Sequence, residues 1–108
     1  MQMPVINLND SAPREMMRGF NGCFVHTEGI TFVEWHVTAG ALLPEHSHPH
    51  EQVTAVQEGE FEMTIDGSKN HLTPGSVAVI PSNVLHSGRA VTDCTIIDVF
   101  HPVREDYR

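Results

Sequence analysis

Several features that mark membrane proteins or nucleic-acid-binding proteins are missing or scarce in this sequence. No run of 18 apolar residues occurs among the 108 residues, so we predict no membrane span and no membrane partner. Lys and Arg together number only six against 14 Asp and Glu, and the net charge of −8 argues against nucleic acid as a partner. The apolar fraction of 40% is ordinary, which leaves a soluble globular fold as the expectation.

Cysteine is also scarce, and the two that occur are far apart in the chain. Residues 1–14 lack the basic start and apolar stretch that are typical of a signal peptide. We therefore expect a cytoplasmic protein in which Cys23 and Cys94 are free thiols in a reducing compartment. A disulfide between them is the alternative.

Short segments rich in β-branched and aromatic residues, separated by Gly and Pro turns, predict strands through most of the chain. The turns are expected at Glu58-Gly59, Asp66-Gly67, Pro74-Gly75 and Pro81-Ser82-Asn83. The predicted strands are residues 20–26, 30–38, 51–57, 60–66, 69–72, 76–80, 84–91 and 95–101. Only residues 11–18 have a helical pattern. The fold class is therefore all-β, a small antiparallel barrel or sandwich in one domain spanning residues 1–108.

The most informative side chains are three histidines and a glutamine. His46 and His48 are two positions apart, so in an extended strand they would face the same point. Gln52 keeps that parity if the strand continues without a bulge, and His86 must come from a neighbouring strand. Three imidazoles and an amide oxygen suit a divalent first-row metal. Three alternatives remain: Gln52 as a spectator, His50 as a ligand in place of His48, or solvent-facing turn histidines.

These residues belong to two spaced motifs that resemble those of the cupins. The first reads Gly40-x5-His46-x-His48-x3-Gln52-x6-Gly59, and the second reads Gly75-x5-Pro81-x-Asn83-x2-His86. The resemblance implies a cupin-type jelly-roll barrel with its metal-binding motifs in residues 40–86, preceded by an N-terminal arm at residues 1–18. Two residues depart from the motifs, because most cupins carry Glu at the position of Gln52 and many carry Gly at that of Asn83.

The departure at Gln52 affects the chemistry. A neutral amide in place of a carboxylate leaves the full charge of the cation, which favours polarising an oxygen of an anionic substrate over redox cycling of iron. We expect Zn, Ni or Mn as the divalent metal ion, with Fe as a further candidate.

The last strand and tail, residues 95–108, narrow the resemblance to the KdgF group of cupins. The residues that carry it are Asp98-Val99-Phe100-His101-Pro102-Val103-Arg104, together with His46-Ser47-His48-Pro49-His50-Glu51-Gln52. The resemblance implies conversion of 4,5-unsaturated uronate monomers to the linear 4-deoxy-5-keto form. It also implies that His46, His48, Gln52 and His86 hold the metal and that Asp98, Phe100 and Arg104 are catalytic.

The residue types of the tail fit that chemistry. Asp98 and Phe100 share one face of the last strand, which would place a carboxylate and an aromatic wall beside the metal. The carboxylate would serve as an acid/base, and Arg104 would bind the substrate carboxylate in a fork geometry. Alternatively, Asp98 is an exposed edge-strand charge, Phe100 only packs in the core, and Arg104 is a surface or interface charge.

Two other functions are alternatives to the conversion of a small-molecule uronate substrate. One is a metal-dependent cupin dioxygenase, against which Gln52 argues. The other is a non-catalytic sugar-binding or regulatory cupin, against which Asp98 together with Arg104 argues. A homodimer is expected in any case, because exposed strand edges make pairing plausible.

Overall fold

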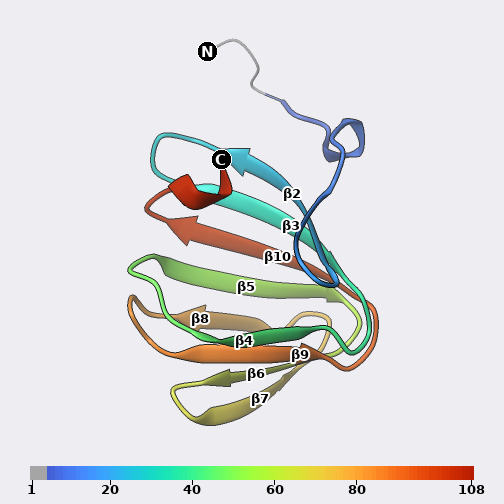
Figure 1. Cartoon of the computed structure of the whole chain (residues 1–108), viewed down its shortest axis with the longest axis vertical. Coiled ribbons are helices and arrows are strands. Elements are labelled where there is room, and N and C mark those ends of the chain that lie inside the picture. The colour runs from blue at the N-terminus through green and yellow to red at the C-terminus, as the bar shows by residue number, and fades with distance from the viewer. Residues whose placement is uncertain (1–4) are drawn as a thin grey trace.

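The computed structural model describes residues 5–108, which form two antiparallel sheets packed face to face (Figure 1). The larger sheet contains, in spatial order, β1 (Arg14–Met17), β2 (Phe20–His26), β3 (Thr31–Val37), β10 (Cys94–His101), β5 (Glu51–Glu58) and β8 (Val77–Ile80). The smaller sheet contains, in spatial order, β4 (Leu42–His46), β9 (His86–Ala90), β6 (Phe61–Ile65) and β7 (Ser68–Leu72). Two short 3-10 turns, η1 (Leu8–Asp10) and η2 (Glu105–Tyr107), complete the described elements.

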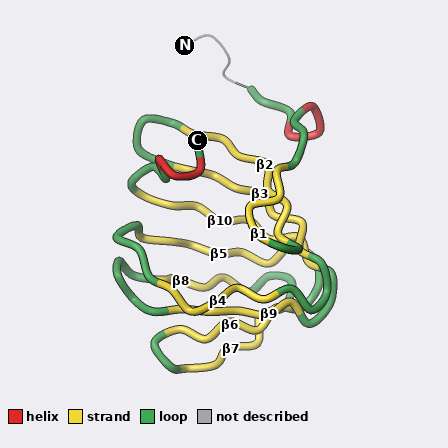
Figure 2. The backbone as a smooth tube through the Cα atoms, viewed as in Figure 1, coloured by secondary structure: helices red, strands yellow, loops and turns green. Residues whose placement is uncertain are grey.

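The predicted all-β jelly-roll architecture is confirmed, although the strands within residues 5–108 form two separate sheets and do not close a complete hydrogen-bonded barrel. The larger sheet ends at β1 and β8, and the smaller one ends at β4 and β7. Figure 2 shows the strands in the middle of the molecule and the loops gathered at their two ends. Candidate site residues can therefore reach the space between the sheets either from a strand interior or from the loops at one end.

The core lies between the sheets because side chains alternate along each strand. In β3 and β10, every second residue is buried, and the intervening ones are more exposed. Phe20 contacts Trp35 edge to face across the larger sheet and Phe61 across the gap to the smaller sheet. Such aromatic pairs add about 0.5–1.5 kcal/mol each beyond the area that they bury.

All eight predicted strands are present, with ends that agree to within two residues. The predicted turns are present too, and each of them contains a residue in the left-handed backbone region. Gly59 has a φ of 82°, and a Cβ there would lie 2.0 Å from the carbonyl oxygen of Asp93. Asn83 has a φ of 65°, which Asn tolerates better than most residues. The replacement of Gly by Asn in the second motif is therefore compatible with the turn.

The helix predicted at residues 11–18 is wrong. Residues Arg14–Met17 form the edge strand β1, which pairs with β2 through an irregular register. The side chains of Met16 and Met17 pack against the core. Pairing and burial at the sheet edge thus override a weak local helical preference. The strand β4 was also not predicted, since Pro44 interrupts its pattern.

Both cysteines are free thiols, as predicted, and the structure shows that both are buried. Among residues 5–108, no helix is long and apolar enough to cross a membrane.

Candidate metal centre and active site

Three histidines meet at one end of the two sheets. His46 is the last residue of β4, and it pairs with His86, the first residue of β9. His48 follows two residues beyond the end of β4. One ring nitrogen from each histidine lies within 4.8 Å of the others, which is close enough for all three to hold one metal ion. The prediction that His86 comes from a neighbouring strand is confirmed, and the cluster contains His48 rather than His50.

The reasoning from strand parity is wrong for His48 and Gln52. β4 ends at His46, and the chain turns before Gln52 enters the interior from β5. The loop between them is held by the turn of the second motif. The backbone N–H of Asn83 donates to the carbonyl of His48 at 2.8 Å, and the hydroxyl of Ser82 donates to that of Pro49 at 2.6 Å. The two motifs therefore cooperate, because the second fixes the loop that carries a ligand of the first.

Each histidine in the cluster has its Nδ1 atom 2.8–2.9 Å from a backbone carbonyl. The acceptors are the carbonyl oxygens of Pro44, His50 and Val84. Because a carbonyl can only accept, Nδ1 carries the proton and Nε2 keeps its lone pair for a metal. The Nε2 atom of His86 is buried and has no hydrogen-bond partner among the described residues, as expected for a ligand atom that a cation would satisfy.

Burial also favours the uncharged form of two of these rings, those of His48 and His86. It lowers the pKa of His48 to about 4, with a further contribution from the positive charge of Arg104. Burial likewise lowers the pKa of His86. Neutral imidazoles are the form that binds metal, so His48 and His86 are ready to bind a cation at neutral pH.

Gln52 lies beside this cluster on β5 and is 3% exposed. Its Oε1 atom is 3.1 Å from Nε2 of His48, and its Nε2 atom donates to the Thr54 hydroxyl at 2.9 Å. With His48 neutral and its proton on Nδ1, two acceptor atoms face each other. A divalent cation close to both would remove that conflict, so the residues fit the metal predicted from the sequence.

A carboxylate is joined to Gln52 through Thr54. The Thr54 hydroxyl donates to Oδ1 of Asp98 at 2.6 Å, and the indole N–H of Trp35 donates to Oδ2 at 2.9 Å. Burial raises the pKa of Asp98, and the bonds from Thr54 and Trp35 act in the opposite direction. Asp98 is 8% exposed on β10, which lies between β3 and β5 inside the sheet. The alternative of an exposed edge-strand charge is therefore wrong.

Thr54 and Trp35 were not predicted as site residues. Thr54 lies on the same face of β5 as Gln52, and the strand register places it opposite Asp98. An interior cavity between the sheets is lined, on the side of the larger sheet, by Gln52, Thr54, Asp98, Trp35 and Phe100. Phe100 is thus both a core residue and part of the cavity wall.

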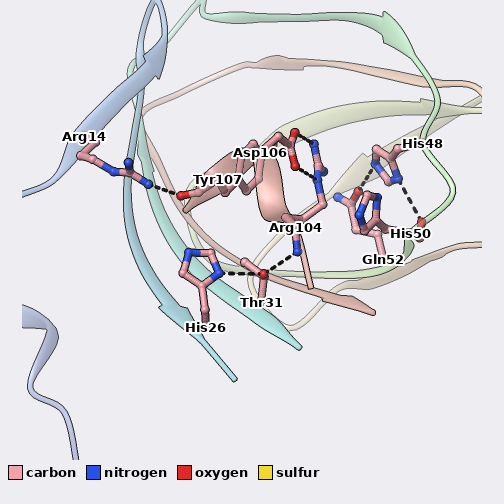
Figure 3. Close-up of polar contacts among 9 residues, drawn as sticks. All are labelled: Arg14, His26, Thr31, His48, His50, Gln52, Arg104, Asp106 and Tyr107. Carbon is pink, nitrogen blue, oxygen red and sulfur yellow. Dashed lines mark hydrogen bonds and ion pairs between the residues drawn. The ribbon is translucent and has the colours of Figure 1, made fainter. Parts of the chain in front are cut away.

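Arg104 follows β10 and is 8% exposed, so it is not a surface charge. Its guanidinium lies over the rings of Phe100 and Tyr107, at 4.8 and 4.1 Å from their centroids. Its Nε and Nη2 atoms donate to the carboxylate of Asp106 at 3.0 and 2.8 Å (Figure 3). The Nε–Nη2 edge of the guanidinium, which could have formed a two-pronged pair with a substrate carboxylate, is therefore occupied by Asp106. The Nη1 atom is buried and has no hydrogen-bond partner among the described residues.

The C-terminal turn that carries Arg104 is anchored at two points. The backbone N–H of Arg104 donates to the hydroxyl of Thr31 at 2.8 Å, and Arg14 donates to the carbonyl of Tyr107 (Figure 3). Asp106, which was not predicted as a site residue, is the partner of Arg104. Its role is recognisable only once the turn at η2 is known.

Comparisons with known proteins identify a matching family and proteins of similar sequence and fold. The family model described as the cupin domain matches residues 33–100. The pectin degradation protein KdgF of Dickeya dadantii is 32% identical over 83 residues, which are 75% of this chain and 76% of that protein. The structure of KdgF from Halomonas sp. has a TM-score of 0.88 at 29% identity and covers 93% of this chain and 94% of its own. The structure of an RmlC-like cupin from Shewanella frigidimarina has a TM-score of 0.93 at 28% identity, and the match covers 98% of this chain and 96% of that one.

Proposed function

Because the chain belongs to the cupin family, we propose that it is a metal-dependent enzyme that opens 4,5-unsaturated uronate monomers to the linear 4-deoxy-5-keto form. The similarity to two proteins named KdgF supports a role in uronate breakdown. The observation that carries the proposal is the buried carboxylate of Asp98, which is linked through Thr54 to Gln52 beside the histidine cluster.

The reaction is an isomerisation that needs two proton movements. The hydroxyl on the anomeric carbon loses its proton as C1 becomes an aldehyde and the bond from C1 to the ring oxygen breaks. The ring oxygen stays on C5 as an enol oxygen, and C4 takes up a proton as the C5 ketone forms. One carboxylate can take the first proton and deliver the second, so no oxidant or reductant is required.

In this proposal Asp98 is that acid/base. Its burial, which raises its pKa, brings its proton affinity closer to the range that acid/base catalysis at neutral pH requires. A divalent ion held by His46, His48 and His86, with Gln52 as fourth ligand, would supply positive charge where the substrate oxygen becomes anionic.

The substrate carboxylate would bind to Arg104. The unpartnered Nη1 atom of Arg104 offers the charged donor that such a group needs, and the guanidinium packs over the ring of Phe100. The protein as a whole is acidic and repels an anion at long range. That field is screened beyond about 8 Å at cellular salt, so the local arginine and metal charge would dominate.

The test is the rate at which the purified protein removes a 4,5-unsaturated galacturonate monomer, followed by the loss of its ultraviolet absorbance. Spontaneous ring opening in buffer gives the background rate. We expect acceleration by the Zn²⁺-, Ni²⁺- or Mn²⁺-loaded protein, loss of that acceleration after chelation, and its recovery when metal is restored. If metal-loaded protein leaves the background rate unchanged, the proposal is wrong and the dioxygenase or sugar-binding hypotheses become the better ones.

A further inference from the structure

We propose that Thr54 is a positioning residue whose single hydroxyl aligns both the Gln52 amide and the Asp98 carboxylate. Thr54 lies on β5 between the candidate ligand and the candidate acid/base, and it is 1% exposed. It is not a member of the histidine cluster and offers no charge. Its contribution would therefore come from the direction of its hydrogen bonds.

The direction follows from the number of hydrogens. A threonine hydroxyl has one hydrogen to donate and two lone pairs with which to accept. The amide nitrogen of Gln52, 2.9 Å away, can only donate to it. The hydroxyl hydrogen is then free for Oδ1 of Asp98 at 2.6 Å. The chain of donors runs in one sense, from the amide to the hydroxyl to the carboxylate.

This sense fixes which end of the Gln52 amide faces the histidines. With the nitrogen held by Thr54, Oε1 points to Nε2 of His48 at 3.1 Å. Without the hydroxyl, the amide nitrogen would lose its acceptor and could turn to donate to His48 instead. An NH₂ group facing the cluster would repel a cation, so removal of the hydroxyl should weaken metal binding.

The same hydroxyl holds the carboxylate. Asp98 accepts from Thr54 on one oxygen and from Trp35 on the other, so both oxygens of the group are fixed in the cavity wall. This half of the inference rests on the proposed function, since it concerns the group that would move the proton. The half that concerns Gln52 depends only on the metal site.

The experiment compares three variants of the full chain. Thr54→Val removes the hydroxyl at nearly constant volume, Thr54→Ser restores a hydroxyl, and Val56→Ala loosens the core on the same strand and face. Val56 is 1% exposed, which makes it a matched buried control. The apparent affinity for Zn²⁺ is measured in competition with a coloured chelator, and thermal unfolding verifies that each variant is folded.

We expect Thr54→Val to weaken Zn²⁺ binding by about 10- to 100-fold, the range known for partners that orient a metal ligand. Thr54→Ser and Val56→Ala should bind Zn²⁺ nearly as the unaltered protein does. If Thr54→Val binds Zn²⁺ as tightly as the unaltered protein, the inference is overturned. Equal weakening in Val56→Ala would also overturn it, because general loosening of the core would then explain the loss.

The fluorescence emission of Trp35 gives a second measurement that needs no substrate. Trp35 is the only tryptophan in the chain, and its N–H bonds directly to Asp98. Its emission should change in Thr54→Val, where the carboxylate loses a partner, and return in Thr54→Ser. Unchanged emission in Thr54→Val would mean that Thr54 does not position Asp98. Neither measurement requires uronate turnover, so a failed activity assay would refute the proposed function and leave these results interpretable.

Discussion

The unfolding free energy of the metal-free protein should depend on pH through His48. Burial, aided by the charge of Arg104, lowers the pKa of His48 in the folded protein from 6.5 to about 4. Between these values the unfolded chain binds a proton that the folded state excludes. Acid therefore favours unfolding, and stability rises with pH across this window. At 1.36 kcal/mol per pKa unit, the loss attributable to His48 reaches about 3 kcal/mol at pH 4 and vanishes above 6.5.

The assay is urea unfolding of metal-free protein, followed by Trp35 fluorescence at several pH values in this window. His48→Gln removes the titrating group, and His36→Gln is the control, because His36 is an exposed histidine on β3. Unfolding free energy should fall more steeply with acid in the unaltered protein than in His48→Gln, by up to about 3 kcal/mol in total. His36→Gln should retain the steep dependence.

Parallel pH profiles for the unaltered protein and His48→Gln would refute the reasoning. They would mean that the ring of His48 is not held neutral by burial in the folded protein. Saturating Zn²⁺ gives an independent check. Because the metal binds only the neutral ring, the Zn²⁺-loaded protein should be more stable and should lose more stability on acidification than the metal-free protein.

Three further predictions concern packing, catalysis and substrate binding. Gly88→Ala should lower the unfolding free energy by about 1–3 kcal/mol, because the new Cβ would lie 2.4 Å from the Phe61 ring. Gly29→Ala is the control in the same urea assay and should have little effect, because its Cβ would lie 3.9 Å from the nearest atom. Asp98→Ala should lower uronate turnover by about 10²- to 10⁴-fold with unchanged Zn²⁺ content, and full activity would show that another group moves the proton. Arg104→Lys should raise the KM for the uronate about tenfold in steady-state assays, and an unchanged KM would place the substrate carboxylate elsewhere.

The histidine cluster was predictable from the sequence because its residues belong to two spaced motifs that resemble those of the cupins. The turn at Pro81-Ser82-Asn83 places His86 at the start of a strand, and the spacing of His46 and His48 limits how far apart they can lie. The assumed mechanism was nevertheless wrong, since β4 ends at His46 and a loop presents His48. A hydrogen bond from Asn83 to that loop, between segments more than thirty residues apart, cannot be inferred from local pattern.

The alternation of side chains along a strand was sufficient to predict that Asp98 and Phe100 share a face, and both lie on the inward face of β10. It could not identify Thr54 as the partner of Asp98. The contact depends on the register between β5 and β10, which is set by tertiary pairing of strands that are far apart in the chain. Trp35 was not predicted as a site residue either, because its indole N–H contacts Asp98 only through the pairing of β3 with β10.

Gln52 was predicted from the sequence as a metal ligand, but its contact with Thr54 is visible only in the structure. From the sequence, its neutral amide was interpreted only as a choice of metal chemistry. The structure adds a second reason, because the group at this position must also satisfy Thr54, whose one hydrogen is donated to Asp98. A glutamate could only accept, so two buried carboxylates would compete for the single hydrogen of Thr54. An amide can accept nothing from Thr54 through its nitrogen, which leaves that hydrogen to Asp98. The residue that departs from the usual cupin motif is therefore the one that suits a carboxylate at position 98.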